Sequence, residues 1–374
     1  SLDGPVWYFA YGSNMNDLLP RRQGPGVTEV VTGTRNRRRW LPWIGGLLGI
    51  AALAWVLRGF DLDRFLAILA GADARFVALV PLAIMGEQFV RAWKWRQLLS
   101  PLRPIGTLYL FGTIMAGYLL AILVPFGFGT IARSWLVARR ETLKLPSVLA
   151  TVALDRLTDG IVFACLAPVA LLSVVFPDPT GGIRAGLIWG SAGSFALFAV
   201  ALLALVGYRR GALSPGGRLA RLLGRLPTRL GEPTRRLAAS FAEGIVWPSQ
   251  AWRGIGIVAA SVAIKLIAAT HFLWAGLAFG VVIEPGQYLF LIVFLGFLII
   301  LGHFARVAGS FIIGAVFALG LFGVEEEQAL AMVLIVEAAN LLSIAAIGAL
   351  SLWWQGVELG ELREPKGEDG GRCV

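Results

Sequence analysis

Long runs of apolar residues separated by short polar segments dominate the chain from about residue 40 onward. A helix that crosses a bilayer needs about 20 consecutive, mainly apolar residues. Hydrophobic residues make up 57% of the chain and charged residues 15%, which indicates a polytopic membrane protein. The pattern predicts six full crossings, at residues 41–57, 76–93, 147–176, 186–207, 254–280 and 329–354.

A further apolar run, residues 105–124, is flanked by basic residues at both ends. Arg91, Lys94, Arg96 and Arg103 precede it as a predicted cytoplasmic loop, and Arg133, Arg139, Arg140 and Lys144 follow it. Basic residues favour the cytoplasmic side, so a full crossing would place one of the two clusters on the wrong face. We therefore predict a re-entrant hairpin that dips in from the cytoplasm, with its break at Pro125, Gly127 and Gly129.

The last interrupted run suggests a second hairpin, entering from the opposite face. His303 and Arg306 interrupt the apolar residues 288–304 and 311–322, and the predicted break residues are Gly309 and Gly314. The acidic residues 325–327 that follow are not a preferred cytoplasmic flank. The predicted fold is thus all-α, with about six full transmembrane helices and two re-entrant hairpins. This layout is typical of inverted-repeat transporters.

The net charge of +10 is carried by loops between the apolar runs, which indicates membrane orientation and argues against nucleic-acid binding. We predict a multi-pass protein of a bacterial inner membrane with both termini in the cytoplasm. Its predicted parts are a cytoplasmic N-terminal segment (1–39), an integral membrane domain (40–356) with an arginine-rich cytoplasmic loop (208–253), and a flexible tail (357–374).

The first of these parts contains VWYFAYGSNMN at residues 6–16, which resembles the opening strand and substrate loop of gamma-glutamylcyclotransferase-like proteins. That match covers about a dozen residues. The enzymes of that family need a compact barrel and a later catalytic glutamate, and here a membrane helix is predicted to begin by residue 40. We expect this segment to be a fragment without enzymatic activity.

Ionisable residues inside membrane segments are costly, so they are usually paired and mark a pathway. Arg133 closely follows the first hairpin break, and Asp155, Arg156 and Asp159 lie in the next span. Asp155 and Asp159 are four residues apart and share a helix face. Two interpretations remain open: a substrate site, or a structural charge cluster in which Arg156 or Arg133 pairs with the two aspartates. Arg133 could also be a snorkelling arginine at the membrane surface.

Other polar residues within apolar runs extend the candidate substrate-binding set. Glu87 lies in a predicted span, where a helix-to-helix hydrogen bond is the alternative role. His303 and Arg306 lie three apart at the second break, and Glu337 lies three before Asn340 on the last helix. Lys265 and His271, six apart, do not share a face, and each is predicted to be a packing or interface residue and not part of a relay. No metal cluster, nucleotide loop or nucleophile–base pair is visible, so no cofactor is expected.

From about residue 90 to 345 the chain resembles the flippase-like family related to the transmembrane part of lysylphosphatidylglycerol synthases. The resemblance is carried by residues 91–99, 120–140, 151–160 and 308–330. Pro125 and Arg133 match the family's first motif, while Arg156 and Asp159 match its second, with Asp155 in place of the usual glutamate. Ala121, Thr130 and Ala308 stand where asparagine, glutamate and proline are usual. The motif PFGFG at residues 125–129 is more similar to the branch of the family that is found with hopanoid-lipid biosynthesis.

The resemblance implies lipid translocation, in which the head group passes a polar notch between the two hairpins. An arginine there would bind a phosphate or hydroxyl group, so the implied partners are membrane lipids with anionic or polyhydroxylated head groups. Aminoacyl-lipid synthesis needs a soluble transferase domain, and the longest soluble stretch is the arginine-rich loop. We therefore expect no enzyme. The alternative is a non-transporting accessory protein that scaffolds a lipid-biosynthesis or glycan-modifying enzyme.

Overall fold

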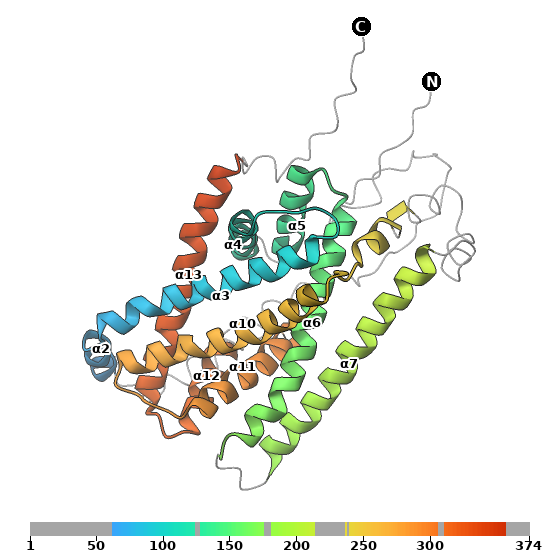
Figure 1. Cartoon of the computed structure of the whole chain (residues 1–374). Helices are drawn as coiled ribbons and strands as arrows, with labels where there is room; N and C mark the ends of the chain where they lie inside the picture. Colours follow the sequence, from blue (N-terminus) through green and yellow to red (C-terminus); the bar gives the residue numbers. More distant parts are fainter. Residues whose placement is uncertain are drawn as a thin grey trace, which may run out of the picture. The chain divides into compact units, whose positions relative to one another are not determined.

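The computed structural model describes residues 62–123, 128–175, 181–213, 236–237, 239–305 and 310–356, all within one compact unit (Figure 1). The regular elements in these ranges are helices. They are α2 (Leu62–Ala70), α3 (Ala74–Leu99), α4 (Thr107–Leu123), α5 (Phe128–Glu141), α6 (Leu145–Leu172), α7 (Gly182–Leu213), α10 (Ala251–Ala278), α11 (Pro285–Ala305), α12 (Ser310–Gly320) and α13 (Glu326–Trp354). The all-α prediction is confirmed. The predicted span 41–57, the segment 1–39 and the tail 357–374 lie outside the described residues.

Among the described residues, four helices are long and apolar enough to cross a membrane: α3, α7 over Arg184–Arg209, α10 and α13. Helix α6 has 28 residues and is equally long, but Asp155, Arg156 and Asp159 interrupt its apolar sequence. At 1.5 Å per residue, such a helix extends roughly 40 Å, more than the hydrocarbon core of a bilayer. The chain is therefore a polytopic membrane protein.

Two ends of the helix bundle differ in charge. We call one of them the acidic end. There, Arg64 Nη2 of α2 pairs with Glu325 Oε2, just before α13, at 2.5 Å. The backbone N–H of Asp73, just before α3, donates to the carbonyl oxygen of Ala278 at the end of α10, at 2.9 Å. At the opposite, basic end, Arg103 Nε lies 3.1 Å from Glu141 Oε2. There too, Lys144 Nζ lies 3.1 Å from Glu243 Oε2, and Ser147 Oγ donates to Ser240 O at 2.6 Å. Helices α3, α6, α10 and α13 run between these two ends.

Helices α4 and α5 form the first hairpin, and both of its outer ends lie at the basic end. The Arg140 guanidinium lies over the Tyr109 ring at 4.1 Å, and Tyr109 Oη donates to Leu136 O at 3.2 Å. Near the middle of the hairpin, a Cβ at Gly129 would collide with the Gly117 carbonyl oxygen. Only a glycine fits this backbone contact, because the two helices touch there. The predicted hairpin is present.

Helices α11 and α12 form the second hairpin, whose outer ends lie at the acidic end. The Phe290 ring near the start of α11 meets Phe322, just after α12, with ring centroids 5.5 Å apart. One turn deeper, Phe294 meets Phe317 at 6.1 Å. The order helix, hairpin, helix thus occurs twice, first from α3 to α6 and then from α10 to α13, with opposite directions across the bundle. This is the inverted-repeat-like layout that the sequence predicts.

The glycine positions within the hairpins differ from the prediction. Gly129 and Gly314 are not in the breaks, because α5 begins at Phe128 and α12 at Ser310. Gly129 instead serves the contact with α4, and Gly314 lies against Leu298 of α11. The other predicted break residues, Pro125, Gly127 and Gly309, lie outside the described residues, as do the two hairpin tips.

Helix α3 is longer than the sequence predicts. The apolar pattern places its end at Trp93 and assigns Arg91 and Lys94 to a cytoplasmic loop. In the structure the helix continues to Leu99, and both side chains are buried. The prediction is wrong because carboxylates on a neighbouring helix neutralise these two charges, which allows the helix to keep them inside the bundle.

The hairpin topology predicts the side from which single cysteines react, in a background with Cys165→Ser and Cys373→Ser. We expect Arg103→Cys and Lys144→Cys, which flank the first hairpin, to react with an impermeant maleimide from one and the same face. Glu284→Cys and Glu325→Cys, which flank the second, should react only from the other face. If Lys144→Cys and Arg103→Cys react from opposite faces, the segment between them crosses the membrane and the hairpin is wrong.

Candidate functional site

One face of α3 carries three charged residues toward the interior of the bundle. Glu87, Arg91 and Lys94 lie at positions i, i+4 and i+7, so their side chains follow one line along the helix. Lys94 is fully buried, Arg91 is 7% exposed and Glu87 is 8% exposed. Unpaired charges at such depth would be unfavourable by several kcal/mol each, so partners must lie close by.

The partners are Asp155 and Asp159, which lie one turn apart on α6 and are almost completely buried. Lys94 Nζ lies 2.6 Å from Asp159 Oδ1 and donates to the Asp155 carbonyl oxygen at 3.0 Å. It also lies 3.0 Å from Asp155 Oδ1, an ion pair without hydrogen-bond alignment. Arg91 donates from Nη1 to Asp159 Oδ2 at 3.1 Å and from Nη2 to Glu87 Oε1 at 2.9 Å. We call these five residues the charge cluster.

Helix α10 adds two basic groups to this cluster. His271 Nε2 lies 3.6 Å from Glu87 Oε2, and Lys265 Nζ lies over the Phe163 ring at 5.5 Å. Lys265 also interacts electrostatically with Asp159 and Glu87. The sequence predicts packing or interface roles for these two residues. Helices α3 and α10 pack along their length, so polar groups on α10 meet those on α3.

Arg133 on α5 is the one buried arginine in this region without a carboxylate partner among the described residues. The side chain is 2% exposed, and its guanidinium lies 5.0 Å from the centroid of the Trp95 ring. Its Nε and Nη2 atoms have no hydrogen-bond partner in the described part of the chain. The alternative of a snorkelling surface arginine is therefore wrong. The two aspartates form their ion pairs with Lys94 and Arg91, and Asp155 interacts with Arg133 only electrostatically, at longer range.

The charges in this region do not cancel. Three carboxylates, those of Glu87, Asp155 and Asp159, face the cations of Arg91, Lys94, Lys265 and Arg133. Arg156, exposed on α6, adds to the positive potential because it lies within electrostatic range of Arg133. The surplus positive charge, and the unpaired N–H groups that carry it, favour binding of an anion.

A cavity of about 540 Å³ opens beside this positive region, between α4 and α13. Its polar lining consists of Tyr118, Glu337 and Asn340. Tyr118 interacts electrostatically with both Arg133 and Arg156, so it links the cavity to the arginines. Ala121 also lines the cavity, at the position where the family resemblance implies asparagine. This side of the site is less polar than the family pattern implies.

The structure therefore gathers most, but not all, of the predicted site residues. Arg133, Asp155, Asp159 and Glu87 lie in one region, with Arg156 at its edge and Glu337 in the adjoining cavity. His303 lies in α11, but its side chain is outside the described parts, and so is Arg306. Four further residues of this region, Arg91, Lys94, Tyr118 and His271, are not among the site residues that the sequence predicts. The spacing of Glu87, Arg91 and Lys94 along one helix face could have revealed two of them.

A family model described as the lysylphosphatidylglycerol synthase TM region matches residues 43–348. The chain belongs to this family. The match includes the whole charge cluster, Arg133 and the cavity residues between α4 and α13, and membership supports a lipid-related role in a membrane. Neither the curated proteins nor the solved structures compared with the chain gave a match. The resemblance of residues 6–16 to gamma-glutamylcyclotransferases finds no support.

Removal of one cation from the charge cluster is expected to destabilise the protein strongly. Lys94→Met removes the only ion pair of Asp155 and one of the two ion pairs of Asp159 among the described residues, and breaking such a buried pair costs about 3–5 kcal/mol. Adding Asp155→Asn should recover part of this loss, because it removes the charge that is left without an ion pair. Thermal unfolding of the purified protein in detergent measures both effects.

Lys144→Met is the matched control for this experiment, since Lys144 pairs with Glu243 on the exposed surface. Exposed pairs contribute at most about 1 kcal/mol, so its unfolding temperature should remain close to that of the wild type. Wild-type stability in Lys94→Met would contradict the ion-pair network.

Proposed function

We propose that this protein moves lipids between the two leaflets of a bacterial inner membrane, and that the lipid head group binds at Arg133. The observation that carries the proposal is the buried guanidinium of Arg133, whose Nε and Nη2 lack partners among the described residues. Buried polar groups are nearly always hydrogen-bonded, so two unpaired N–H groups favour a ligand that accepts from both. A phosphate or another anionic head group has the required oxygens.

The surroundings of Arg133 suit passage of a head group better than a purely structural role. The carboxylates of the charge cluster are already held by Lys94 and Arg91, so an incoming anion need not displace a partner of Arg133. The cavity beside Tyr118 offers polar contacts at Glu337 and Asn340. These features form the polar notch of the proposal.

The rim of the cavity suits the lipid tails. Ile122 on α4 and Leu341 on α13 line the cavity and are 51% and 52% exposed. Apolar side chains at this position would contact acyl chains that remain in the bilayer while the head group enters the notch. A polar interior with apolar flanks is what translocation of an amphipathic molecule requires.

Charge asymmetry supports the proposed orientation. The basic end holds Arg103, Arg139, Arg140 and Lys144, and positive residues favour the cytoplasmic side of a bacterial inner membrane. Helix α13 ends at this side, which supports a cytoplasmic C-terminus. We assign transport rather than bond-making chemistry, because the cluster carboxylates are engaged in ion pairs and none is poised as a free base.

The test is leaflet exchange in proteoliposomes that contain fluorescent lipids with anionic, polyhydroxylated or zwitterionic head groups. We expect wild-type protein to accelerate exchange of at least one anionic or polyhydroxylated lipid above the rate in empty vesicles. Arg133→Gln should slow this exchange about 10- to 100-fold, because it removes a charged hydrogen-bond donor from the notch. Arg75→Gln, an exposed arginine near the start of α3, is the control and should leave the rate unchanged.

Two outcomes would overturn the proposal. If no lipid in the panel exchanges faster than in empty vesicles, the accessory-protein alternative replaces transport. If transport occurs but Arg133→Gln matches the wild type while keeping its unfolding temperature, the head group does not pass Arg133.

A further inference from the structure

An imidazole faces a carboxylate inside the bundle, where α10 packs along α3 (Figure 1). His271 Nε2 lies 3.6 Å from Glu87 Oε2, and both residues are 8% exposed. Glu87 lies near the middle of α3, so the contact is in the part of the helix that spans the membrane. Histidine ordinarily titrates between about pH 5 and 8. The contact therefore joins a group that can gain a proton to a group that can stabilise the added charge.

The hydrogen bonds around this contact leave one position open for a proton. His271 donates to the backbone of Ala83, one turn before Glu87. Nε2 has no hydrogen-bond partner among the described residues, so this bond is made by Nδ1, which keeps the proton of the neutral ring on Nδ1. The lone pair of Nε2 and a carboxylate oxygen, both acceptors, then face each other. One proton between them makes a charge-assisted hydrogen bond, which is typically about 2.7–2.9 Å long.

The neighbouring helices present ionisable groups to this pair. Glu87 Oε1 accepts from Arg91 Nη2 at 2.9 Å, so Oε2 is the oxygen that remains for His271. The other described ionisable groups on this side of the bundle are Lys94 on α3, Asp155 and Asp159 on α6, Lys265 on α10, Tyr118 on α4 and, in the cavity beside Tyr118, Glu337 on α13. The two aspartates are engaged in ion pairs, and lysine, tyrosine and arginine ordinarily titrate at about pH 10 or above. The imidazole is thus the group of this set suited to exchange a proton near neutral pH.

Arg91 connects the pair to the proposed head-group site. It binds Glu87 and Asp159 at once, and it interacts electrostatically with Tyr118 and Arg133. A proton on His271 adds one positive charge to this region, and it gives Glu87 a second cation to pair with besides Arg91. Both effects favour an anion at Arg133. By thermodynamic linkage, an anion at Arg133 favours the proton to the same extent.

We infer that Glu87 and His271 form a proton-binding site, which takes up one proton together with an anionic head group at Arg133. The proton comes from the water on one side of the membrane, adds to the lone pair of His271 Nε2 and is held there by Glu87 Oε2. It returns to the water on the other side when the head group leaves. The coupling to the head group rests on the proposed transport function, whereas the proton-binding site itself does not.

The first experiment detects the proton directly, without lipid movement. The chain has two histidines, so ring-nitrogen NMR of the wild type and of His303→Gln, labelled with ¹⁵N-histidine in bilayers, assigns the signals of His271. We expect Nδ1 to stay protonated throughout and Nε2 to gain a proton in one step between about pH 5 and 8. In Glu87→Gln this step should occur at least about one pH unit lower, because the stabilising carboxylate is lost. Glu243→Gln, an exposed acid paired with Lys144, is the matched control and should leave the step unchanged.

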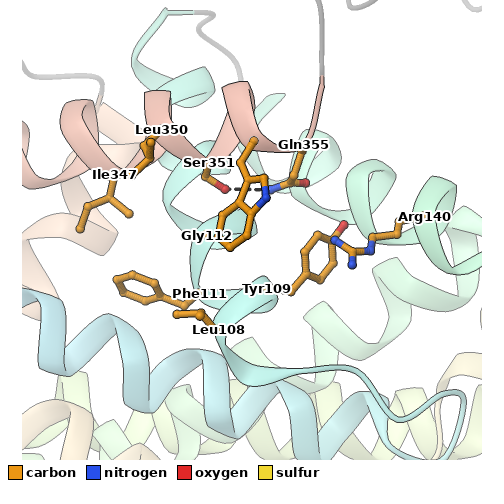
Figure 2. A pocket seen from close by; sticks show the side chains of 10 residues that line it. Leu108, Tyr109, Phe111, Gly112, Arg140, Ile347, Leu350, Ser351 and Gln355 are labelled. Atoms are coloured by element: carbon orange, nitrogen blue, oxygen red, sulfur yellow. Dashed lines mark hydrogen bonds between the residues drawn. The ribbon is translucent and has the colours of Figure 1, made fainter.

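The second experiment tests the coupling in proteoliposomes with fluorescent phosphatidylglycerol, which carries one negative charge. One proton per lipid makes the exchange electroneutral, so a gradient of one pH unit should hold up to about a tenfold ratio of the lipid between the leaflets. A protonophore, or the variant His271→Gln, should return the distribution to even. Tyr109→Phe is the control: Figure 2 shows Tyr109 beside Arg140 in a different crevice, at the basic end, so this variant should accumulate lipid as the wild type does.

Each outcome has a distinct meaning. If Nε2 of His271 does not change its protonation between about pH 5 and 8, or if Glu87→Gln titrates as the wild type while keeping its unfolding temperature, the proton-binding site is wrong. An even distribution of phosphatidylglycerol in the wild type under a pH gradient overturns the coupling, as does accumulation by His271→Gln. If no lipid exchanges at all, the transport proposal and the coupling fail, while the proton-binding site still stands or falls by the NMR titration.

Discussion

The ion pairs that join Lys94 and Arg91 of α3 to Asp155 and Asp159 of α6 make the rest of the bundle possible. Each of these charges alone would be expelled from a membrane interior, whereas together they neutralise one another and hold two long helices in register. Helix α10 packs along α3 and adds His271 beside Glu87. The network therefore fixes three helices around one point, and the shorter α4 and α5 are arranged beside them.

Most of the helices follow from the apolar pattern, because a span must be about 20 residues long and its ends are marked by charge or proline. The first hairpin was also predictable, since basic residues flank residues 105–124 on both sides. The end of α3 was not. A lysine just after an apolar run looks the same in sequence whether it reaches water or pairs with a buried aspartate, and only the position of α6 distinguishes the two.

In the candidate site too, the sequence predicts which residues are involved, but only the packing of the helices determines which of them form ion pairs. Arg133, Asp155 and Asp159 were predicted as ionisable residues within apolar segments, which is a property of the chain alone. Which cation pairs with which carboxylate depends on distances between α3, α5 and α6. Lys94 forms the ion pairs with the aspartates that the sequence would allow Arg133 or Arg156 to form, and Nε and Nη2 of Arg133 have no hydrogen-bond partner in the described structure.

The backbone contact between Gly117 and Gly129 has a mechanical consequence. Helix α4 carries Tyr118 and α5 carries Arg133, and the glycine contact clamps the two helices so that neither can slide or roll without the other. The wall of the cavity at Tyr118 and the nearby Arg133 are thus held close to one fixed point of contact between the two helices. Just beyond the end of α5, Thr142 adopts a left-handed conformation with φ of 54°, in the short turn that leads into α6. Because the glycine contact couples α4 to α5, a displacement of Tyr118 relative to the charge cluster would also carry Arg133.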